Sequence, residues 1–306
     1  MFGLDQFSWT AKWSPYFFLF LVAVALLYWL AVEKYRHKFA DSGPVTPRQK
    51  LFFLSGLLMI YIAHGSPLDL MGHLMFSAHM SSMAIAFLIA PPLLWLGIPG
   101  WLIAPLFMRW KKTWLRFLLN PIFTLLFFNG VFSFYHIPAL HDMIMTNYWL
   151  HTAVYVLLYA SALLMWWPIA GPLRELHGLS DLKKVAYVFA DGVLLTPACA
   201  LIIFANAPLY DIYSDPQLWA TALGYCVPGD AAVFLEKFRG PETFALIPPI
   251  HDQQLGGVIM KLMQELMYGS ILFYILYHWY KSENRSAPDM SLDPIDLDAD
   301  GNLKRA

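Results

Sequence analysis

Histidine and methionine side chains give this sequence its clearest capacity for chemistry. Seven of the ten histidines lie near the ends of long apolar segments or in the loops between them: His64, His73, His79, His136, His141, His151 and His251. Imidazole is the commonest metal ligand in proteins, and helices that end at one interface can supply several imidazoles from different elements. The pattern predicts a metal site, provided that these segment ends lie on one side of the molecule.

Several methionines accompany these histidines. Four residues are spaced by four, and wherever that stretch is helical they stay near one helical face: Met71, Met75, His79 and Met83. Thioether and imidazole ligands together favour Cu(I), whereas zinc sites more often combine thiolate, imidazole and carboxylate. Methionine at helical spacing is also ordinary packing in a membrane protein, and a single histidine is often a hydrogen-bonded structural residue.

The predicted cofactor is therefore copper, as a hypothetical Cu(I) ion, and its candidate ligands fall into two ranks. The first rank is His79, Met83, His136, His141 and His151. The second rank is His64, His73 and His251. Asp142 or Asp252 is expected to orient an imidazole, because carboxylates close to metal-binding histidines commonly do so.

The elements that must position these residues are membrane-spanning helices. Hydrophobic residues make up 58% of the chain and charged residues 13%, whereas soluble domains have about half and about a quarter. Seven apolar runs approach the roughly 20 residues that span a hydrocarbon core: Pro15–Val32, Lys50–His64, Phe76–Ile98, Phe117–Phe134, Trp149–Pro168, Lys184–Asn206 and Gly257–His278. We therefore predict an all-α integral membrane protein, a seven-transmembrane helix bundle.

Lysine and arginine determine the predicted orientation, because basic residues concentrate in the loops on the inner side of a membrane. Sixteen of the twenty basic residues fall in alternate connections, at residues 33–50, 99–116 and 171–184 and after residue 280. The other four are Lys12, Lys237, Arg239 and Lys261. The sequence thus predicts an outer N-terminus, an inner C-terminus and seven histidines on or near the outer side.

The predicted domain organisation follows from these spans. Residues 1–281 are interpreted as a single polytopic membrane domain, since seven helices leave little sequence for a soluble one. Residues 282–306 are polar and are predicted to form a disordered cytoplasmic tail. No basic segment precedes the first apolar run, so we expect that run to remain as a span and not to act as a cleaved signal.

Two acidic residues fall inside predicted spans, where ionisable groups are costly and usually paired. Asp191 lies in the sixth run and Glu265 in the seventh. They are interpreted as a buried acid pair, a proton path, a copper exit route or structural hydrogen-bonding groups. The segment Asp252-Gln253-Gln254-Leu255-Gly256-Gly257 precedes the seventh run. Its polar side chains are suited to capping that helix, and its glycines permit close backbone approach.

Motifs for catalysis and thiol chemistry are absent from the sequence. It contains no His-Glu-x-x-His, no Gly-x-Ser-x-Gly and no glycine-rich phosphate loop. Its two cysteines, Cys199 and Cys226, form no Cys-x-x-Cys pair, and the depth expected for Cys199 argues against a disulfide. The protein is therefore predicted not to be an enzyme.

A series of short motifs follows the chain within a span region of roughly residues 10–280. They are Ser66-Pro67-Leu68, Phe76-Ser77-Ala78-His79-Met80, Ala90-Pro91-Pro92, Leu96-Gly97-Ile98-Pro99, Trp166-Trp167-Pro168, Pro208-Leu209-Tyr210 and the Asp252–Gly257 segment, together with His136, His141, His151 and Met260. Their order resembles the multi-span CtaG family, the cytochrome c oxidase assembly factors of Bacillus-type Gram-positive bacteria. In many members of that family a second histidine follows the one matching His79 by four residues, where this chain has Met83.

The resemblance implies a multi-pass protein of the cell membrane that acts in the maturation of haem–copper oxidases, particularly the caa type. The implied partners are subunits I or II of cytochrome c oxidase and the lipid bilayer, with other copper chaperones as further candidates and no nucleic acid. Together with the histidines and methionines, the resemblance predicts an assembly factor that binds copper at the outer face and assists its insertion.

Other interpretations remain open at this point. A copper permease would use the histidines for entry and Met263, Glu265 and Met267 as a path. A metal-free scaffold would hold oxidase subunits while their cofactors are inserted. A haem-binding protein would ligate iron through histidines on facing helices, and an intramembrane hydrolase would need a metal-activated water.

Overall fold

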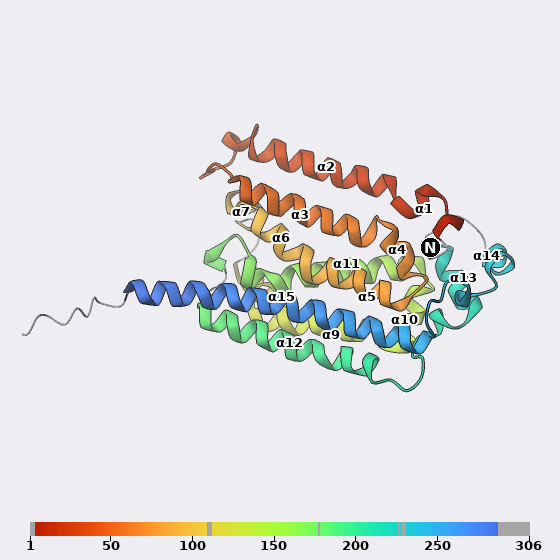
Figure 1. Cartoon of the computed structure of the whole chain (residues 1–306). Helices are drawn as coiled ribbons and strands as arrows, with labels where there is room; N and C mark the ends of the chain where they lie inside the picture. Colours follow the sequence, from red (N-terminus) through yellow and green to blue (C-terminus); the bar gives the residue numbers. More distant parts are fainter. Residues whose placement is uncertain (1–3, 109–111, 177, 226, 228–230, 287–306) are drawn as a thin grey trace, which may run out of the picture.

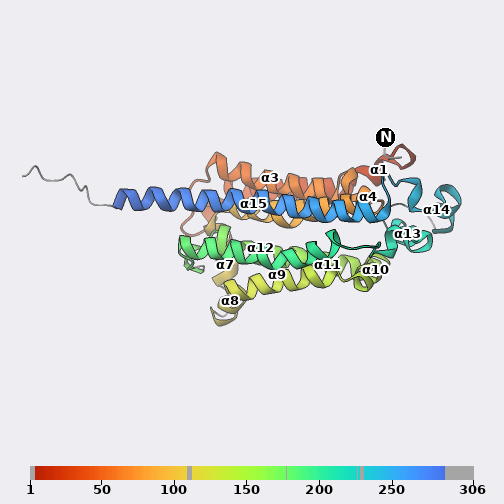
Figure 2. The same ribbon diagram turned by 60° about the horizontal axis from the view of Figure 1, so that its bottom comes forward.

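The computed structural model describes residues 4–108, 112–176, 178–225, 227 and 231–286. Regular structure within these ranges is helical throughout, without a strand. The long helices lie side by side in one elongated bundle, and the chain passes repeatedly from one end of the bundle to the other (Figure 1). The turned view shows that short helices gather at both ends of this bundle (Figure 2).

Six helical stretches of the described chain are long and apolar enough to cross a membrane. They are Trp9–Val32, Pro47–Leu74, Phe76–Gly97, Tyr148–Ala170, Asp181–Ile203 and Pro249–Glu283. A seventh crossing results if the bent pair Pro121–Tyr135 and Pro138–Met145 counts as one span. The predicted all-α, multi-span membrane bundle is therefore confirmed, with six or seven crossings.

The fourth predicted run forms a short helix followed by a sharp bend. α9 (Pro121–Tyr135) has 15 residues, about 22 Å at 1.5 Å per residue, which is less than a hydrocarbon core of about 30 Å. The Asn120 side chain caps α9, and Pro121 occupies its first turn. After Tyr135 the chain bends by 79° into α10 (Pro138–Met145). The helix thus starts four residues later than its predicted run.

Most other long helices agree closely with the predicted runs. They are α2 (Pro15–Val32), α3 (Pro47–His64), α11 (Tyr148–Ala170) and α12 (Asp181–Ile203). α3 begins with a capping box, in which the Thr46 hydroxyl accepts from the backbone N–H of Gln49 and the Gln49 side chain accepts from the N–H of Thr46.

The last helix, α15 (Pro249–Ser286), extends beyond its predicted run at both ends. Residues 282–286, the first of the predicted tail, continue this helix. The rest of that predicted tail, residues 287–306, lies outside the described residues. The apolar run alone could not reveal the full length, since the polar first and last turns of α15 lie outside the hydrophobic stretch.

The third span contains a π-helical turn. It consists of α5 (Phe76–Ala84), the π turn η3 (Ile85–Ile89) and α6 (Ala90–Gly97), which has Pro91 and Pro92 near its start. Proline has no N–H, so the carbonyl of Phe87 lacks a backbone donor. The indole Nε1–H of Trp166 on α11 donates to that carbonyl at 2.9 Å. The π turn and one tryptophan keep this proline-containing span continuous.

Short elements close the two ends of the bundle (Figures 1 and 2). One end, called here the histidine end, carries η1 (Leu4–Gln6), α1 (Trp9–Trp13), α4 (Pro67–Gly72), α10, η5 (Asp211–Tyr213), α13 (Pro216–Leu223), α14 (Ala231–Phe238) and η6 (Pro241–Thr243). The opposite end, called the basic end, carries η2 (Arg36–Lys38), α7 (Gly100–Met108), α8 (Lys112–Leu118), η4 (Arg174–Leu176) and the last turns of α15.

The histidine end has a small hydrophobic core of its own, in segments that the apolar runs predict only as loops between spans. Five aromatic side chains form its centre: Phe7, Trp219, Phe234, Phe238 and Phe244. α4 stops at Gly72, and Met75 is in extended conformation immediately before α5. The series from Met71 to Met83 therefore lies on two separate helices, and only its last two members, His79 and Met83, share a face of α5.

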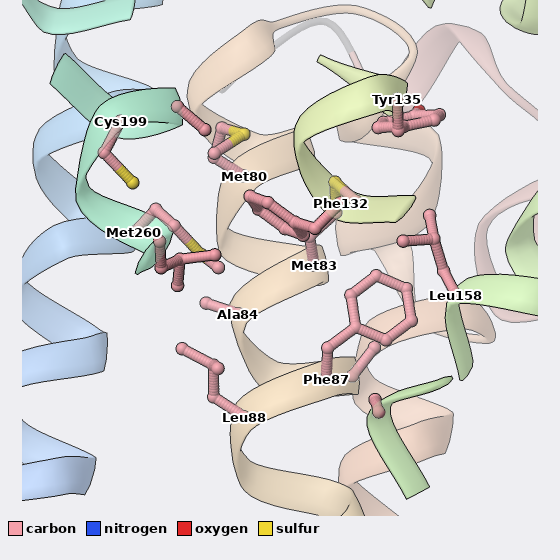
Figure 3. Packing of buried hydrophobic residues seen from close by; sticks show 14 of the residues in the cluster. Met80, Met83, Ala84, Phe87, Leu88, Phe132, Tyr135, Leu158, Cys199 and Met260 are labelled. Atoms are coloured by element: carbon pink, nitrogen blue, oxygen red, sulfur yellow. The ribbon is translucent and has the colours of Figure 1, made fainter. Parts of the chain in front are cut away.

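The main core lies between α5, α9, α11, α12 and α15. Met80 and Met83 of α5 pack there with Phe132 of α9 and Met260 of α15 (Figure 3). α15 approaches its neighbours through glycine, because a Cβ atom added at Gly256 would lie 2.7 Å from Cδ1 of Phe76. The predicted close backbone approach at this segment is confirmed.

Candidate metal centre

The histidine end brings together six of the eight predicted ligands. They are His64 at the end of α3, His73 after α4, His79 on α5, His136 after α9, His141 on α10 and His151 on α11. Their ring centroids lie close together, at 5.4 Å between His79 and His141 and 6.0 Å between His73 and His151. We call His79, Met80, His136 and His141 the deep group, and His64, His73 and His151 the rim group.

In the deep group, His136 and Met80 present two electron-pair donors to each other. Nδ1 of His136 lies 2.8 Å from the carbonyl oxygen of Phe132, so Nδ1 carries the proton of the neutral ring. Nε2 is then unprotonated, and it lies 3.4 Å from Sδ of Met80, which has no proton either. A tetrahedral metal about 2.0 Å from nitrogen and about 2.3 Å from sulfur would place these two atoms about 3.5 Å apart.

His141 is fully buried among aromatic rings, the nearest of which is Tyr210 with centroids 4.5 Å apart. Nδ1 of His141 lies 3.5 Å from Oδ1 of Asp142, an electrostatic contact at the outer limit of hydrogen bonding. Nε2 has no hydrogen-bond partner among the described residues. An imidazole nitrogen in such a position is costly unless a ligand or water occupies it.

Two tyrosine hydroxyls hold the ring of His79. The hydroxyl of Tyr135 lies 3.2 Å from Nε2, and the hydroxyl of Tyr155 lies 3.5 Å from Nδ1. Tyr135 also directs its hydroxyl at Sδ of Met145, 3.5 Å away. The deep group is therefore surrounded by phenols and thioethers, which are neutral groups that leave the imidazoles available to a cation.

The rim group is organised around Asp69 and Tyr155. Nδ1 of His64 lies 3.7 Å from Oδ1 of Asp69, and Nδ1 of His73 lies 3.1 Å from the Asp69 carbonyl oxygen. The ring of His151 lies against Tyr155, with centroids 4.4 Å apart, and its buried Nε2 has no hydrogen-bond partner within the described chain. Because Tyr155 also contacts His79, this tyrosine connects the rim group to the deep group.

The two predicted orienting carboxylates mainly hold backbone segments. The Asp142 carboxylate accepts from the backbone N–H groups of Asp211 at 3.0 Å and Ile212 at 3.3 Å, which fixes η5. Asp252 accepts from the N–H groups of Phe76 at 2.6 Å and Ser77 at 3.3 Å. Asp252 thus caps α5, the helix that carries His79 and Met80. The prediction that its segment caps the seventh helix is wrong.

Two tyrosines from the η5 segment complete the enclosure. Tyr210 donates to the carbonyl oxygen of His136 at 3.0 Å, and Tyr213 donates to the carbonyl oxygen of Gly72 at 2.8 Å. Burial raises the pKa of Tyr213 well above its ordinary value. Tyr213 therefore remains a neutral hydrogen-bond donor beside the cluster.

Two predicted ligands lie apart from these contacts. The Met83 side chain is fully buried in the main hydrophobic core, one turn further along α5 than His79. His251 is exposed in the first turn of α15, and its Nδ1 lies 3.3 Å from Oε1 of Gln254. The sequence series selected Met83, whereas the structure places its neighbour Met80 against an imidazole.

The two acidic residues of the spans do not form a pair. Asp191 is buried and accepts hydrogen bonds from Nδ2 of Asn129 and the hydroxyl of Tyr268. The Glu265 side chain is 61% exposed and forms an ion pair with Lys261 at 2.7 Å. The interpretation as a buried acid pair is therefore wrong. Glu265 lies at the surface of the bundle, so it does not line an internal path of the kind that a permease would need.

Sequence reasoning missed the residues that complete the deep group. Met80 and Tyr210 enter the sequence analysis only as members of family-like motifs, without a predicted role, and Tyr135 and Tyr155 do not enter it at all. The sequence did contain a signal for the role of His136. Phe132 and His136 are one helical turn apart, so Nδ1 of His136 can donate to the carbonyl oxygen of Phe132 and leave Nε2 free of a proton. Cys226 and His177 lie outside the described residues, while Cys199 is a buried free thiol.

Among the described residues, no three His, Cys, Asp or Glu side chains are placed to hold one metal ion together. The available donors are instead the His136–Met80 pair and single imidazole nitrogens of His141 and His151, whereas both ring nitrogens of His79 contact tyrosine hydroxyls. Thioether with imidazole is a soft donor set that suits Cu(I) better than the harder divalent ions.

Fold and site together define a polytopic helical membrane protein with a buried histidine–methionine cluster at one end of its bundle. The family model described as "Cytochrome c oxidase caa3 assembly factor (Caa3_CtaG)" matches residues 26–282. The chain therefore belongs to this family, and the resemblance inferred from its motifs is confirmed. Neither a curated protein nor a solved structure matches the chain.

Proposed function

We propose that this protein assists the assembly of a caa-type cytochrome c oxidase by binding Cu(I) in the deep group and delivering it to an oxidase subunit. The family assignment supports the assembly role. The cargo is inferred from the donor set, since copper is the soft metal of haem–copper oxidases and the deep group offers thioether and imidazole. Subunits I and II are both candidate recipients.

One observation carries the copper proposal: Nε2 of His136 and Sδ of Met80 face each other at 3.4 Å with no proton between them. Two electron-pair donors in contact repel each other unless a cation lies between them or the imidazole is protonated. A protonated imidazole would be a buried charge, and the described residues offer it no carboxylate partner. A Cu(I) ion bound to both atoms removes the repulsion.

The proposal includes the orientation of the bundle. The histidine end faces the outside and the basic end the inside, because sixteen of the twenty basic residues belong to alternate connections. Copper would then be taken up and handed over on the outer side. Single cysteines placed at Asp215 and at Arg48 would be labelled by a membrane-impermeant maleimide in intact cells only at position 215.

Copper binding is tested on the full-length protein, purified without oxygen and titrated with Cu(I) against a colorimetric chelator. We expect one or two Cu(I) ions per chain. The double variant Met80→Leu/His136→Ala should lose more than tenfold in affinity, and X-ray absorption should show that Met80→Leu removes the sulfur scatterer. Met83→Leu and His251→Ala serve as matched controls that keep copper.

A different result would change the mechanism. If the wild-type chain binds no Cu(I) under reducing conditions, the copper proposal fails and the metal-free scaffold becomes the explanation of the assembly role. Complementation of a deletion strain separates the two cases: a scaffold predicts normal oxidase activity from Met80→Leu/His136→Ala, whereas a copper-delivery factor predicts loss that added copper partly restores.

A further inference from the structure

An apolar pocket lies at the basic end, away from the deep group and the rim group. Its volume is about 330 Å³, and it is lined by side chains of α6, α7, α8 and α11, with Leu119 just after α8. Trp95, Phe107, Leu115, Ala160 and Trp167 belong to this lining. With about 30 Å³ for each water-sized group, the pocket has room for about ten methylene-sized groups. Figure 2 shows α7 and α8 at the end opposite α10, α13 and α14.

One polar atom in this lining has no partner. The ring of Trp167 is fully buried between Phe107, at 5.0 Å, and Trp95, at 4.9 Å. Indole Nε1–H is a donor only, and that of Trp167 has no acceptor among the described residues, whereas that of Trp95 donates to the carbonyl oxygen of Leu163 at 2.8 Å. A buried donor of this kind requires an acceptor from outside the described residues, such as a bound ligand.

The surroundings of the pocket indicate its depth in the membrane. Trp167 lies one turn from the end of α11 at Ala170, so it belongs near the boundary between acyl chains and headgroups. α8 exposes Trp114 and Phe117 beside Arg116. Exposed tryptophan is typical of that interface, and a cation there attracts anionic lipid headgroups. Leu106, on the pocket wall, is 60% exposed to the side of the bundle.

We propose that this pocket binds one acyl chain of an anionic glycerophospholipid. The ester carbonyl of the lipid accepts the hydrogen bond of Trp167, and Arg116 pairs with the phosphate. The bound chain fills the space between α7, α8 and α11 and fastens the short α7 and α8 helices to the bundle. This lipid site is independent of copper and goes beyond the proposed function.

Native mass spectrometry of the full-length protein tests the site. The protein is exchanged into micelles that contain equal amounts of dioleoyl phosphatidylglycerol and dioleoyl phosphatidylcholine. We expect one retained phosphatidylglycerol per chain, at least fivefold over phosphatidylcholine. Ala160→Trp fills the pocket and should reduce retention at least fivefold, whereas Ala153→Trp, at an exposed position of the same helix outside the pocket, should retain lipid as wild type does.

Two further variants separate the parts of the proposal and keep it testable if Ala160→Trp fails to fold. Trp167→Phe keeps an aromatic ring and removes the N–H, so it should lose the preference for ester-linked over ether-linked phosphatidylglycerol. Arg116→Gln should reduce the preference for phosphatidylglycerol, and Arg48→Gln at another basic-end position should not. Equal retention by Ala160→Trp and Ala153→Trp, or equal binding of both headgroups by the wild type, would overturn the proposal.

Discussion

Two buried polar clusters lie in the same bundle and differ in how their hydrogen bonds are met. Around Asp191, each carboxylate oxygen accepts from a side chain of a neighbouring helix, Asn129 on α9 and Tyr268 on α15, and among the described residues only Oδ1 of Asn129 in these three side chains has no partner. In the deep group, donors and acceptors do not match, since Nε2 of His136 faces the sulfur of Met80 and Nε2 of His141 has no partner among the described residues.

The difference separates polar groups whose hydrogen bonds are made within the fold from polar groups whose hydrogen bonds are left unmade, as the proposed copper site requires. A matched cluster ties helices together, and removing one member leaves the others unsatisfied in a medium without water. An unmatched cluster lowers the stability of the ligand-free protein and gains from a cation. The four predictions below test this contrast in order of decreasing effect.

The largest effect is expected for Asp191→Leu, which removes the acceptor of the Tyr268 hydroxyl and one of the two acceptors of the Asn129 amide, the other being the carbonyl oxygen of Leu125. We expect a loss of about 3 kcal/mol in the free energy of unfolding, because one buried O–H and one buried N–H lose their acceptor. Unfolding in mixed detergent micelles measures it. Tyr268→Phe removes a single donor and should cost less. An unchanged stability of Asp191→Leu would show that the cluster does not contribute to the stability of the fold.

Copper should stabilise the wild-type protein by a comparable amount. At a free Cu(I) concentration of about 100 times the dissociation constant, the gain is about 2.7 kcal/mol, since the ion binds only the folded chain. Thermal unfolding with and without buffered Cu(I) shows it as a rise in Tm. In Met80→Leu this rise should shrink, while the Asp191→Leu variant should keep it. If Cu(I) raises the Tm of Met80→Leu/His136→Ala as much as that of the wild type, the ion binds at another site.

A smaller loss is expected for Asp252→Ala, which removes the cap of α5. Capping side chains contribute about 0.5–2 kcal/mol, and we expect the upper part of that range because the carboxylate serves two backbone N–H groups and the Ser77 hydroxyl. Asp252→Asn keeps one acceptor oxygen and should cost about half as much. Chemical unfolding measures the stability of the wild type, Asp252→Ala and Asp252→Asn. Equal stability of the two variants would contradict the capping role.

The smallest effect on stability is expected for His141→Phe, and it is the sharpest contrast with Asp191→Leu. Replacing an imidazole without hydrogen-bond partners by an apolar ring should change the stability of the metal-free protein by less than about 1 kcal/mol. The stabilisation by Cu(I) should nevertheless decrease. A large destabilisation of metal-free His141→Phe would mean that His141 has a structural partner, such as a buried water.

The sequence was sufficient to predict the membrane-spanning helices. It was insufficient to predict which side chains contact each other in the deep group. The boundaries of α2 could be predicted because its apolar run ends where its polar neighbours begin. The contact of His136 with Met80 depends on the 79° bend after α9 and on the separation of α4 from α5. Neither feature produces a periodic pattern of hydrophobic residues in the sequence. The capping of α5 by Asp252 joins residues 176 positions apart, and local patterns do not encode such contacts.

The length of α15 makes it a rigid rod between the two faces of the membrane. Its 38 residues extend over about 57 Å at 1.5 Å per residue, nearly twice the hydrocarbon thickness of about 30 Å. Figure 1 shows it projecting past the other helices at the basic end. Its first turns hold the N-terminus of α5 through Asp252. A sideways force on the projecting part would therefore act, by leverage, on the helix that carries His79 and Met80.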